Sequence, residues 1–284
     1  MERAVSFESA DIVLKGTLHR PDGGAGPRAG IVLCHGFGGS SSGAGHPEFA
    51  RALEQAGYVV LRFDFRGCGS SGGERGRVIC MEEVEDLRNA IGFVQAQDGV
   101  DAARIGVIGA SLGGSVAVYA AAIDQRVRAC AANGAIGNGE RRFRFQYHDD
   151  AAWKKFLARL ESAKRYRRET GQSVMIERFD IVMIPEKRRA GLPKDATMAF
   201  PAETAISMLE LDPESVVRRI APRPLLLIHP RGDDVVPASE SERLAAAAGE
   251  PCELHIIDVD DHFSSGDPRL QKITLEWLAR NLKG

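Results

Sequence analysis

The sequence predicts an α/β fold built on a mostly parallel sheet of eight strands with helices on both faces. Three observations support this prediction. Apolar, β-rich runs alternate with helical patterns over most of the chain, glycine-rich turns follow several of these runs, and the alternation stops once, between residues 136 and 212. The 284 residues can bury one large core, and a composition of 44% hydrophobic and 27% charged residues is that of a globular protein.

The expected elements follow from local pattern along the chain. The two N-terminal strands are predicted to pair in antiparallel fashion, and the remaining strands alternate with helices. The expected strands are residues 4–8, 12–19, 30–34, 58–63, 105–108, 127–132, 225–228 and 253–258. A helix over residues 47–56 is ended by Gly57, and one over residues 82–97 places Val84, Leu87 and Ile91 on a single face.

A Gly-x-Ser-x-Gly pattern joins the strand at residues 105–108 to a small-residue helical run at residues 115–122. Gly109 and Gly113 flank Ser111, and a tight strand-to-helix turn of this kind tolerates only small neighbours. Such a turn exposes the serine hydroxyl at the edge of the sheet. Ser111 is therefore a candidate nucleophile, and the N–H of Leu112, at the start of the next helix, is a candidate oxyanion donor.

A carboxylate and a histidine follow Ser111 in the chain, each just past a predicted strand. Asp233 and the adjacent Asp234 follow the strand at residues 225–228, and His262 follows the strand at residues 253–258. Because the carboxyl ends of parallel strands meet on one rim, these groups are expected near Ser111. The pattern predicts that His262 takes the Ser111 proton while an aspartate holds the imidazole in the correct tautomer.

The turn after an early strand is expected to supply a second oxyanion donor. Residues 35–39 read His-Gly-Phe-Gly-Gly directly after the strand at residues 30–34. The amide of Phe37, the residue after His-Gly, is the predicted partner of the Leu112 amide. His35 has two interpretations at this point, a contact to substrate or a side chain that fixes the loop.

Taken together, these motifs resemble α/β-hydrolase-fold serine hydrolases. Residues 63–71 (Phe-Asp-Phe-Arg-Gly-Cys-Gly-Ser-Ser), 232–237 (Gly-Asp-Asp-Val-Val-Pro) and 261–263 (Asp-His-Phe) add to the likeness. They are similar to the bacterial branch of cinnamoyl and feruloyl esterases, dienelactone-hydrolase-like proteins and serine-aminopeptidase-like esterases. The resemblance covers residues 1–136 and 212–284, which would form the core. It favours Asp233 as the acid, since that residue lies four positions before Pro237.

The resemblance implies a carboxylesterase that hydrolyses its substrate through a Ser111 acyl-enzyme, with neither a cofactor nor a metal. Thioester hydrolysis, C–C bond hydrolysis and amide or peptide hydrolysis would use the same triad and stay open. A ligand receptor without catalytic activity is an alternative of a different class, against which the complete set of catalytic groups argues.

Residues 137–211 interrupt the alternation where a short crossover is expected, and they resemble the cap that α/β-hydrolases carry over the active site. Residues 140–194 hold 15 Lys and Arg against 8 Asp and Glu, whereas the rest of the chain holds 22 against 31. An amphipathic helix is predicted over residues 149–169, with Trp153, Phe156, Leu157 and Leu160 on one face. The basic residues alternate with apolar helix positions, which favours a solvated helix face over a nucleic-acid site.

The inserted segment is rich in methionine and aromatic residues, which either line an apolar substrate pocket or pack the segment onto the core. Five residues are candidate substrate contacts, namely His35, Phe143, Met175, Met183 and His229. They predict a small-molecule ester with an apolar or aromatic group. For His229 a structural role is the alternative, and arginines of this segment are further candidates for attracting an anionic substrate.

Composition indicates the cellular environment that we expect for the protein. The five cysteines are odd in number and widely spaced, which favours a reducing, cytoplasmic environment over a disulfide framework or a zinc site. The first residues lack the apolar stretch of a secretory signal, and no apolar run is long enough to cross a bilayer. Neither a nucleic acid nor a membrane is an expected partner, and a homodimer stays open.

Overall fold

The central element of the protein is the eight-stranded sheet that the sequence predicts. The computed structural model describes residues 1–284 except 24–25, 44, 190–191, 193–195, 263–265 and 283–284. Strand order in the sheet is β1-β2-β4-β3-β5-β6-β9-β10. The strands are β1 (Glu2–Ser9), β2 (Ile12–His19), β3 (Arg28–Cys34), β4 (Val59–Phe63), β5 (Val100–Ala110), β6 (Val127–Asn133), β9 (Leu225–Pro230) and β10 (Cys252–Ile257).

Pairing in this sheet is parallel from β4 onwards. β1 pairs with β2, and β2 with β4, in antiparallel fashion, whereas the pairs among β4, β3, β5, β6, β9 and β10 are parallel. The central strands β3, β4 and β9 are mostly apolar and buried along their length, as strands covered on both faces require. All parallel strands therefore end on one rim, which is where the candidate catalytic residues follow β5, β9 and β10.

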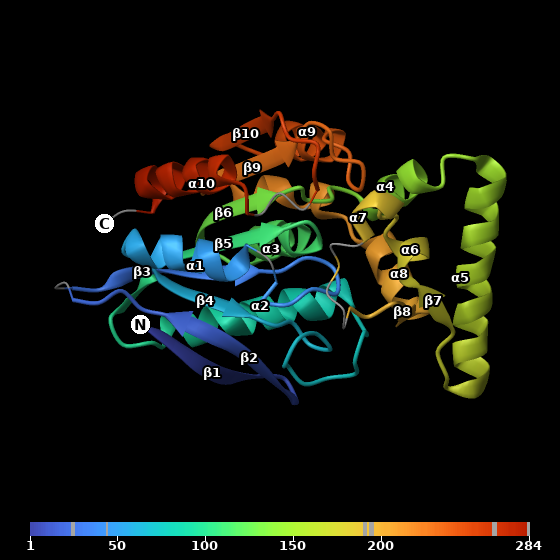
Figure 1. The fold of residues 1–284 in the computed structure, drawn as a ribbon, viewed down its shortest axis with the longest axis horizontal. Helices are drawn as coiled ribbons and strands as arrows, with labels where there is room; N and C mark the ends of the chain where they lie inside the picture. The colour runs from blue at the N-terminus through green and yellow to red at the C-terminus, as the bar shows by residue number, and fades with distance from the viewer. Residues whose placement is uncertain (24–25, 44, 190–191, 193–195, 263–265, 283–284) are drawn as a thin grey trace.

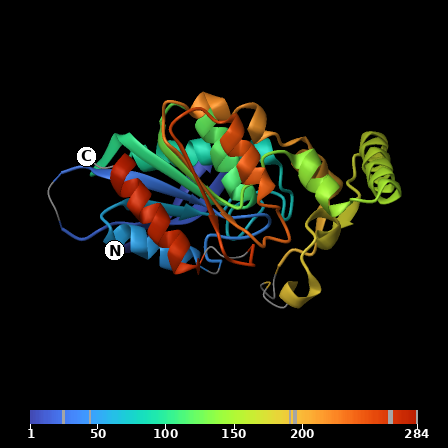
Figure 2. The same cartoon turned by 90° about the horizontal axis from the view of Figure 1, so that it is seen from above.

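Helices cover both faces of the sheet (Figures 1 and 2). One face packs against α1 (His46–Gln55) and α10 (Pro268–Asn281), which contribute Leu53 and Trp277 to its core. The other face packs against α2 (Cys80–Gln95), α3 (Leu112–Ile123) and α9 (Ser239–Ala247). The mostly parallel α/β sheet with helices on both faces confirms the predicted fold class. Among the described helices, none is both long and apolar enough to cross a membrane.

Most of the segment between β6 and β9 lies beyond one end of the sheet, with α5 farthest from it in both views (Figures 1 and 2). Its elements are α4 (Gly139–Gln146), α5 (Asp150–Thr170), β7 (Met175–Glu177), α6 (Arg178–Ile181), α7 (Glu186–Arg189), β8 (Ala199–Pro201) and α8 (Ala202–Glu210), before two short 3₁₀ helices, Pro213–Ser215 and Val217–Ile220. We call residues 137–211 the inserted segment. β7 and β8 form a small antiparallel sheet that sequence pattern does not predict, because three-residue strands carry no periodicity.

The long helix of the inserted segment follows the predicted pattern closely. The Asp149 carboxylate caps α5 by accepting from the Ala152 N–H at 2.8 Å, and Gly171, with φ 74°, ends the helix in the left-handed conformation. Phe156 and Leu160 are buried, whereas Trp153 and Leu157 on the same face are half-buried. The apolar face of α5 therefore packs onto the rest of the inserted segment.

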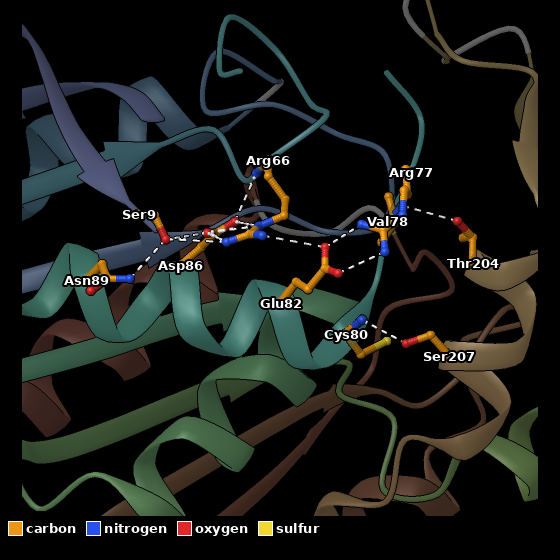
Figure 3. A network of polar contacts seen from close by, with 10 residues as sticks. All are labelled: Ser9, Arg66, Arg77, Val78, Cys80, Glu82, Asp86, Asn89, Thr204 and Ser207. Atoms are coloured by element: carbon orange, nitrogen blue, oxygen red, sulfur yellow. Dashed lines mark hydrogen bonds and ion pairs between the residues drawn. The ribbon is translucent and has the colours of Figure 1, made fainter. Parts of the chain in front are cut away.

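The inserted segment is held to the core by directed polar contacts (Figure 3). On α8, Thr204 Oγ1 accepts from the Val78 N–H at 3.1 Å, and Ser207 Oγ accepts from the Cys80 N–H at 2.9 Å. Cys80 is the first residue of α2, and the residue before it, Ile79, has no side chain that can cap. The hydroxyl of Ser207 thus satisfies a donor at the start of a core helix, as an N-cap residue does.

Candidate active site

Ser111 lies at the turn between β5 and α3, in a backbone conformation that residues other than glycine rarely adopt. Its φ is 54° and its ψ is −124°. The flanking glycines are required by close backbone contacts. A Cβ at Gly109 would lie 2.1 Å from the Gly113 carbonyl oxygen, and one at Gly113 would lie 2.2 Å from the His35 carbonyl oxygen. The Gly-x-Ser-x-Gly pattern therefore reflects a turn packed too tightly for any other residue at these two positions.

Three side chains from different loops meet at this turn. His262 Nε2 lies 2.8 Å from Ser111 Oγ, and His262 Nδ1 lies 2.6 Å from Asp233 Oδ2. The side chains of Asp233 and His262 are 0% and 6% exposed, so water is largely excluded from their contact. The structure thus brings together the serine, histidine and aspartate that the sequence singled out, although 151 residues separate His262 from Ser111.

Asp233 is held in place by its own loop. Its Oδ1 accepts from the backbone N–H groups of Val235 and Val236, both at 2.9 Å. Burial on its own would raise the pKa of Asp233, but hydrogen bonds from His229 and His262 and from the Val236 N–H outweigh it and hold that pKa well below the ordinary carboxyl value. The carboxylate therefore stays ionised beside the imidazole.

The neighbouring Asp234 points elsewhere. Its Oδ2 lies 3.4 Å from Nη2 of Arg188, a residue of α7 in the inserted segment. The same arginine pairs with Asp261, the residue before His262. Arg188 thus links the loops that carry Asp233 and His262. Sequence reasoning missed this residue, because one arginine on a four-residue helix in a basic segment carries no distinguishing pattern.

The turn at residues 36–39 lies directly against the nucleophile. A Cβ at Gly36 would lie 3.3 Å from Ser111 Cβ, and the Gly39 N–H closes the turn on the Gly36 carbonyl at 3.0 Å. Within the described part of the chain, neither the Phe37 amide nor the Leu112 amide makes a hydrogen bond. Two unengaged N–H groups on the two segments that flank Ser111 could serve as an oxyanion site.

His35 fixes this turn from behind. Its ring is buried, and its Nε2 accepts from the Phe65 N–H at 3.1 Å. The ring hydrogen is therefore on Nδ1, which donates to the Gly36 carbonyl at 2.9 Å. Burial lowers the pKa of His35, so the neutral ring that this geometry needs is favoured. The structure favours the loop-fixing interpretation of His35 over a contact to substrate.

The other candidate substrate contacts lie in varied surroundings. His229 is fully buried, with Nδ1 at 2.7 Å from Ser241 Oγ and Nε2 at 2.9 Å from the Val236 carbonyl oxygen, so it supports the acid loop and does not face a ligand. Phe143 is also fully buried, stacked on Phe156 inside the inserted segment. Met175 and Met183 are half exposed. Phe263, part of the quoted motif, lies outside the described residues.

Phe37 is clamped by the inserted segment. Its ring lies 4.5 Å from that of Phe200 on β8, measured between centroids, and the guanidinium of Arg178 on α6 lies 5.3 Å from the Phe37 centroid. Arg178 Nη2 also donates to the Phe37 carbonyl oxygen at 3.1 Å. Sequence reasoning missed Arg178 because, like Arg188, it is one arginine in a basic segment and carries no distinguishing pattern. The contact joins positions 141 residues apart.

Comparison with known proteins finds one matching family model and several similar proteins. Residues 25–268 match the family model described as "Serine aminopeptidase, S33". An uncharacterized 31.7 kDa protein of Escherichia coli, from the traX-finO intergenic region, is 29% identical over 262 residues, covering 89% of this chain and 91% of that protein. A polyketide transferase of Penicillium is 28% identical (91% and 88% covered), and a thiohydrolase of Aspergillus aculeatus is 26% identical (91% and 85%).

Solved structures agree on the fold. The α/β hydrolase GrgF from Penicillium superposes with a TM-score of 0.81 at 21% identity, covering 99% of each chain. The ferulic-acid complex of Est1E from Butyrivibrio proteoclasticus superposes with a TM-score of 0.69 at 18% identity, covering 98% of this chain and 99% of that one. At these identities the likeness establishes the α/β-hydrolase architecture.

Proposed function

This chain belongs to the serine aminopeptidase family of α/β-hydrolases, and on that premise we propose that it cleaves a carboxylic ester through an acyl-enzyme formed on Ser111. One observation carries the proposal. An unbroken chain of hydrogen bonds runs from Asp233 through His262 to Ser111, and beside the serine lie two backbone amides that bond to none of the described residues. These are the groups that acyl transfer to a hydroxyl nucleophile requires.

In the first half-reaction Ser111 Oγ attacks the ester carbonyl carbon. His262 Nε2, 2.8 Å from Oγ, takes the hydroxyl proton as the C–O bond forms. Asp233, bonded to Nδ1, holds the ring so that Nε2 faces the serine, and it stabilises the imidazolium. The tetrahedral intermediate then collapses, the alkoxy group leaves with the proton from His262, and the acyl group stays on Ser111.

The negative charge that develops on the carbonyl oxygen needs donors that are in place before reaction. The N–H groups of Phe37 and Leu112 fill that role in the proposal, the second at the N-terminus of α3, where the helix dipole favours an anion. In the second half-reaction water attacks the acyl carbon with His262 as base. Ser111 regains its proton and the carboxylic acid leaves.

We propose that residues 137–211 form a cap that belongs to the active site, on a core of residues 1–136 and 212–284. Support comes from the contacts of this segment with the turn at residues 36–39 and with the loops that carry Asp233 and His262. A small ester with an apolar or aromatic acyl or alkyl group suits the methionine and aromatic content of this segment. The ferulic acid bound to Est1E points to the same class.

Thioester cleavage is the second candidate, favoured by the relatives named as a polyketide transferase and a thiohydrolase. The same serine, histidine and amides would act on a thioester, whose thiolate leaving group needs less help from a general acid. C–C bond hydrolysis and amide hydrolysis would use the same groups, and an anilide in the substrate panel tests the amide alternative.

The proposal is tested with a fluorophosphonate probe and a substrate panel. We expect a single label on Ser111, turnover of p-nitrophenyl acetate, and loss of both in Ser111→Ala, with the exposed Ser42→Ala as control. The panel compares short and long p-nitrophenyl esters, an aryl ester, an acyl-CoA thioester and an anilide. Labelling at another residue, or activity that survives Ser111→Ala, would contradict the assignment. Higher kcat/KM on the thioester than on every ester would favour the second candidate.

A further inference from the structure

Arg178 is a buried cation whose hydrogen-bond partners are backbone carbonyls. Its side chain donates from Nη2 to the Phe37 carbonyl oxygen at 3.1 Å and from Nη1 to the Thr197 carbonyl oxygen at 3.0 Å, while Nε has no partner. No carboxylate of the described residues lies within 4 Å of it. The residue is 5% exposed, and burial lowers its pKa. A buried guanidinium with only neutral partners costs free energy, so the contacts that it makes matter to the packing around it.

The carbonyls of the turn at residues 36–39 decide where the Phe37 amide points. The Gly36 carbonyl, which shares a peptide plane with the Phe37 N–H, accepts from the Gly39 N–H at 3.0 Å and from His35 Nδ1 at 2.9 Å. The next plane carries the Phe37 carbonyl and leads into Gly38, whose φ is 54°. A glycine there leaves that plane free to rotate. Arg178 is the group that holds its carbonyl.

Packing strengthens this restraint. The guanidinium carbon of Arg178 lies 5.3 Å from the Phe37 ring centroid and 5.7 Å from that of Phe200. A Cβ at Gly38 would lie 3.0 Å from the Phe200 ring and 3.1 Å from Arg178 Nη1, so a side chain at this position would crowd both groups. The turn that carries the Phe37 amide is therefore held between Ser111 on one side and the inserted segment on the other.

We propose that Arg178 is a positioning residue for the oxyanion site, through which the inserted segment sets the orientation of the Phe37 amide. The inference rests on the proposed function, since an oxyanion site matters only if acyl transfer takes place at Ser111. It goes beyond that function by making the inserted segment part of transition-state stabilisation. The segment would then act on kcat as well as on substrate choice.

Arg223 provides a matched comparison within the same chain. It is also a buried arginine, it donates to the backbone carbonyls of Asp124 and Val127, and its Nε is likewise without a partner. Burial lowers its pKa as well. It lies in the core, against the start of β6, at the opposite end of that strand from Ser111. Loss of Arg223 therefore reports the cost of losing a buried arginine without touching the turn at residues 36–39.

The experiment compares Arg178→Met, Arg178→Lys and Arg223→Met with the wild type. The readouts are kcat and KM on p-nitrophenyl acetate, the inhibition constant of a trifluoromethyl ketone, and thermal unfolding. We expect Arg178→Met to lower kcat about tenfold to a hundredfold, less than complete loss of an oxyanion donor costs, while KM changes by less than about threefold. Trifluoromethyl ketone affinity should fall in parallel with kcat/KM, because the hemiketal adduct uses the same amides.

Arg178→Lys, which keeps the charge and can donate to the Phe37 carbonyl, should recover part of kcat. Arg223→Met should lower the melting temperature yet keep kcat within about twofold of the wild type. If Arg178→Met and Arg178→Lys both match Arg223→Met in kcat and in ketone affinity, the inference is wrong. A wild type that neither hydrolyses esters nor takes the fluorophosphonate label would overturn the proposed function, and this inference with it.

Discussion

His229 Nε2 lies 3.4 Å from Asp233 Oδ2, the carboxylate oxygen that also bonds to His262. Asp233 therefore has an imidazole on each side, one fully buried behind the acid loop and one facing Ser111. Because the Val236 carbonyl accepts from Nε2 of His229 at 2.9 Å, that nitrogen carries the ring hydrogen, and this polar N–H lies beside the Asp233 carboxylate. The pair accounts for much of the depressed pKa of Asp233.

Because of Asp233, the free energy of unfolding should decrease as the pH falls into the acid range. Its folded pKa lies below the unfolded value, so its contribution is present above the ordinary carboxyl range and is lost as pH falls through the folded pKa. We expect the free energy of unfolding to fall more steeply between about pH 5 and pH 2 in the wild type than in Asp233→Asn. Urea unfolding at several pH values measures both slopes, and equal slopes would contradict the prediction.

The two adjacent aspartates should differ sharply in their effect on catalysis. In Asp233→Asn the amide oxygen keeps the bonds from the Val235 and Val236 N–H groups and turns the amide NH₂ toward His262 Nδ1, which favours the wrong tautomer, so kcat should fall by a factor on the order of 10³–10⁴. Asp234→Asn weakens the ion pair with Arg188 at 3.4 Å, the contact of this carboxylate among the described residues, and should cost at most about tenfold. Steady-state kinetics on one activated ester gives both values. The reverse ranking would move the acid to Asp234.

Gly113→Ala should disrupt the turn that carries Ser111. The added Cβ would lie 2.2 Å from the His35 carbonyl oxygen and 2.8 Å from that of Cys34, both backbone atoms that cannot move alone. We expect a loss of stability above about 2 kcal/mol together with loss of activity, because the strain falls on β3 and the turn after it.

Gly92→Ala is the matched control for this substitution. Gly92 lies inside α2, and its added Cβ would meet only the end of the Arg126 side chain, at 3.4 Å. Alanine should therefore stabilise the protein by about 0.5–1 kcal/mol through helix propensity, with kcat unchanged. Chemical unfolding with parallel kinetics separates the two glycines. Similar stability changes for both variants would contradict the packing argument.

The hydroxyl of Ser207 should contribute to stability but not to catalysis. Ser207→Ala leaves the first N–H of α2 without its partner, which should lower the free energy of unfolding by about 1 kcal/mol (Figure 3). We expect kcat/KM to stay within about twofold, because α2 carries none of the reacting groups. Ser207→Thr keeps the hydroxyl and should recover most of the loss. Unchanged stability in Ser207→Ala would mean that water replaces the cap.

The sequence by itself determined the fold class and which residues are candidates for the triad. Gly109, Ser111 and Gly113 are diagnostic because a strained turn constrains residues that are adjacent in the chain. Alternating strand and helix patterns likewise depend on near neighbours, so they predicted the parallel sheet and hence the rim that Ser111, Asp233 and His262 share.

Only the tertiary structure decided the contacts between segments far apart in the chain. It oriented Asp233 toward His262 and Asp234 toward Arg188, a difference that two identical neighbouring side chains cannot express in sequence. It buried Phe143 and His229, two residues that sequence reasoning had proposed as substrate contacts. It also brought Arg178 to Phe37 across 141 residues. Such contacts depend on how the inserted segment packs, and a lone arginine acquires its role only from the carbonyl that the fold places beside it.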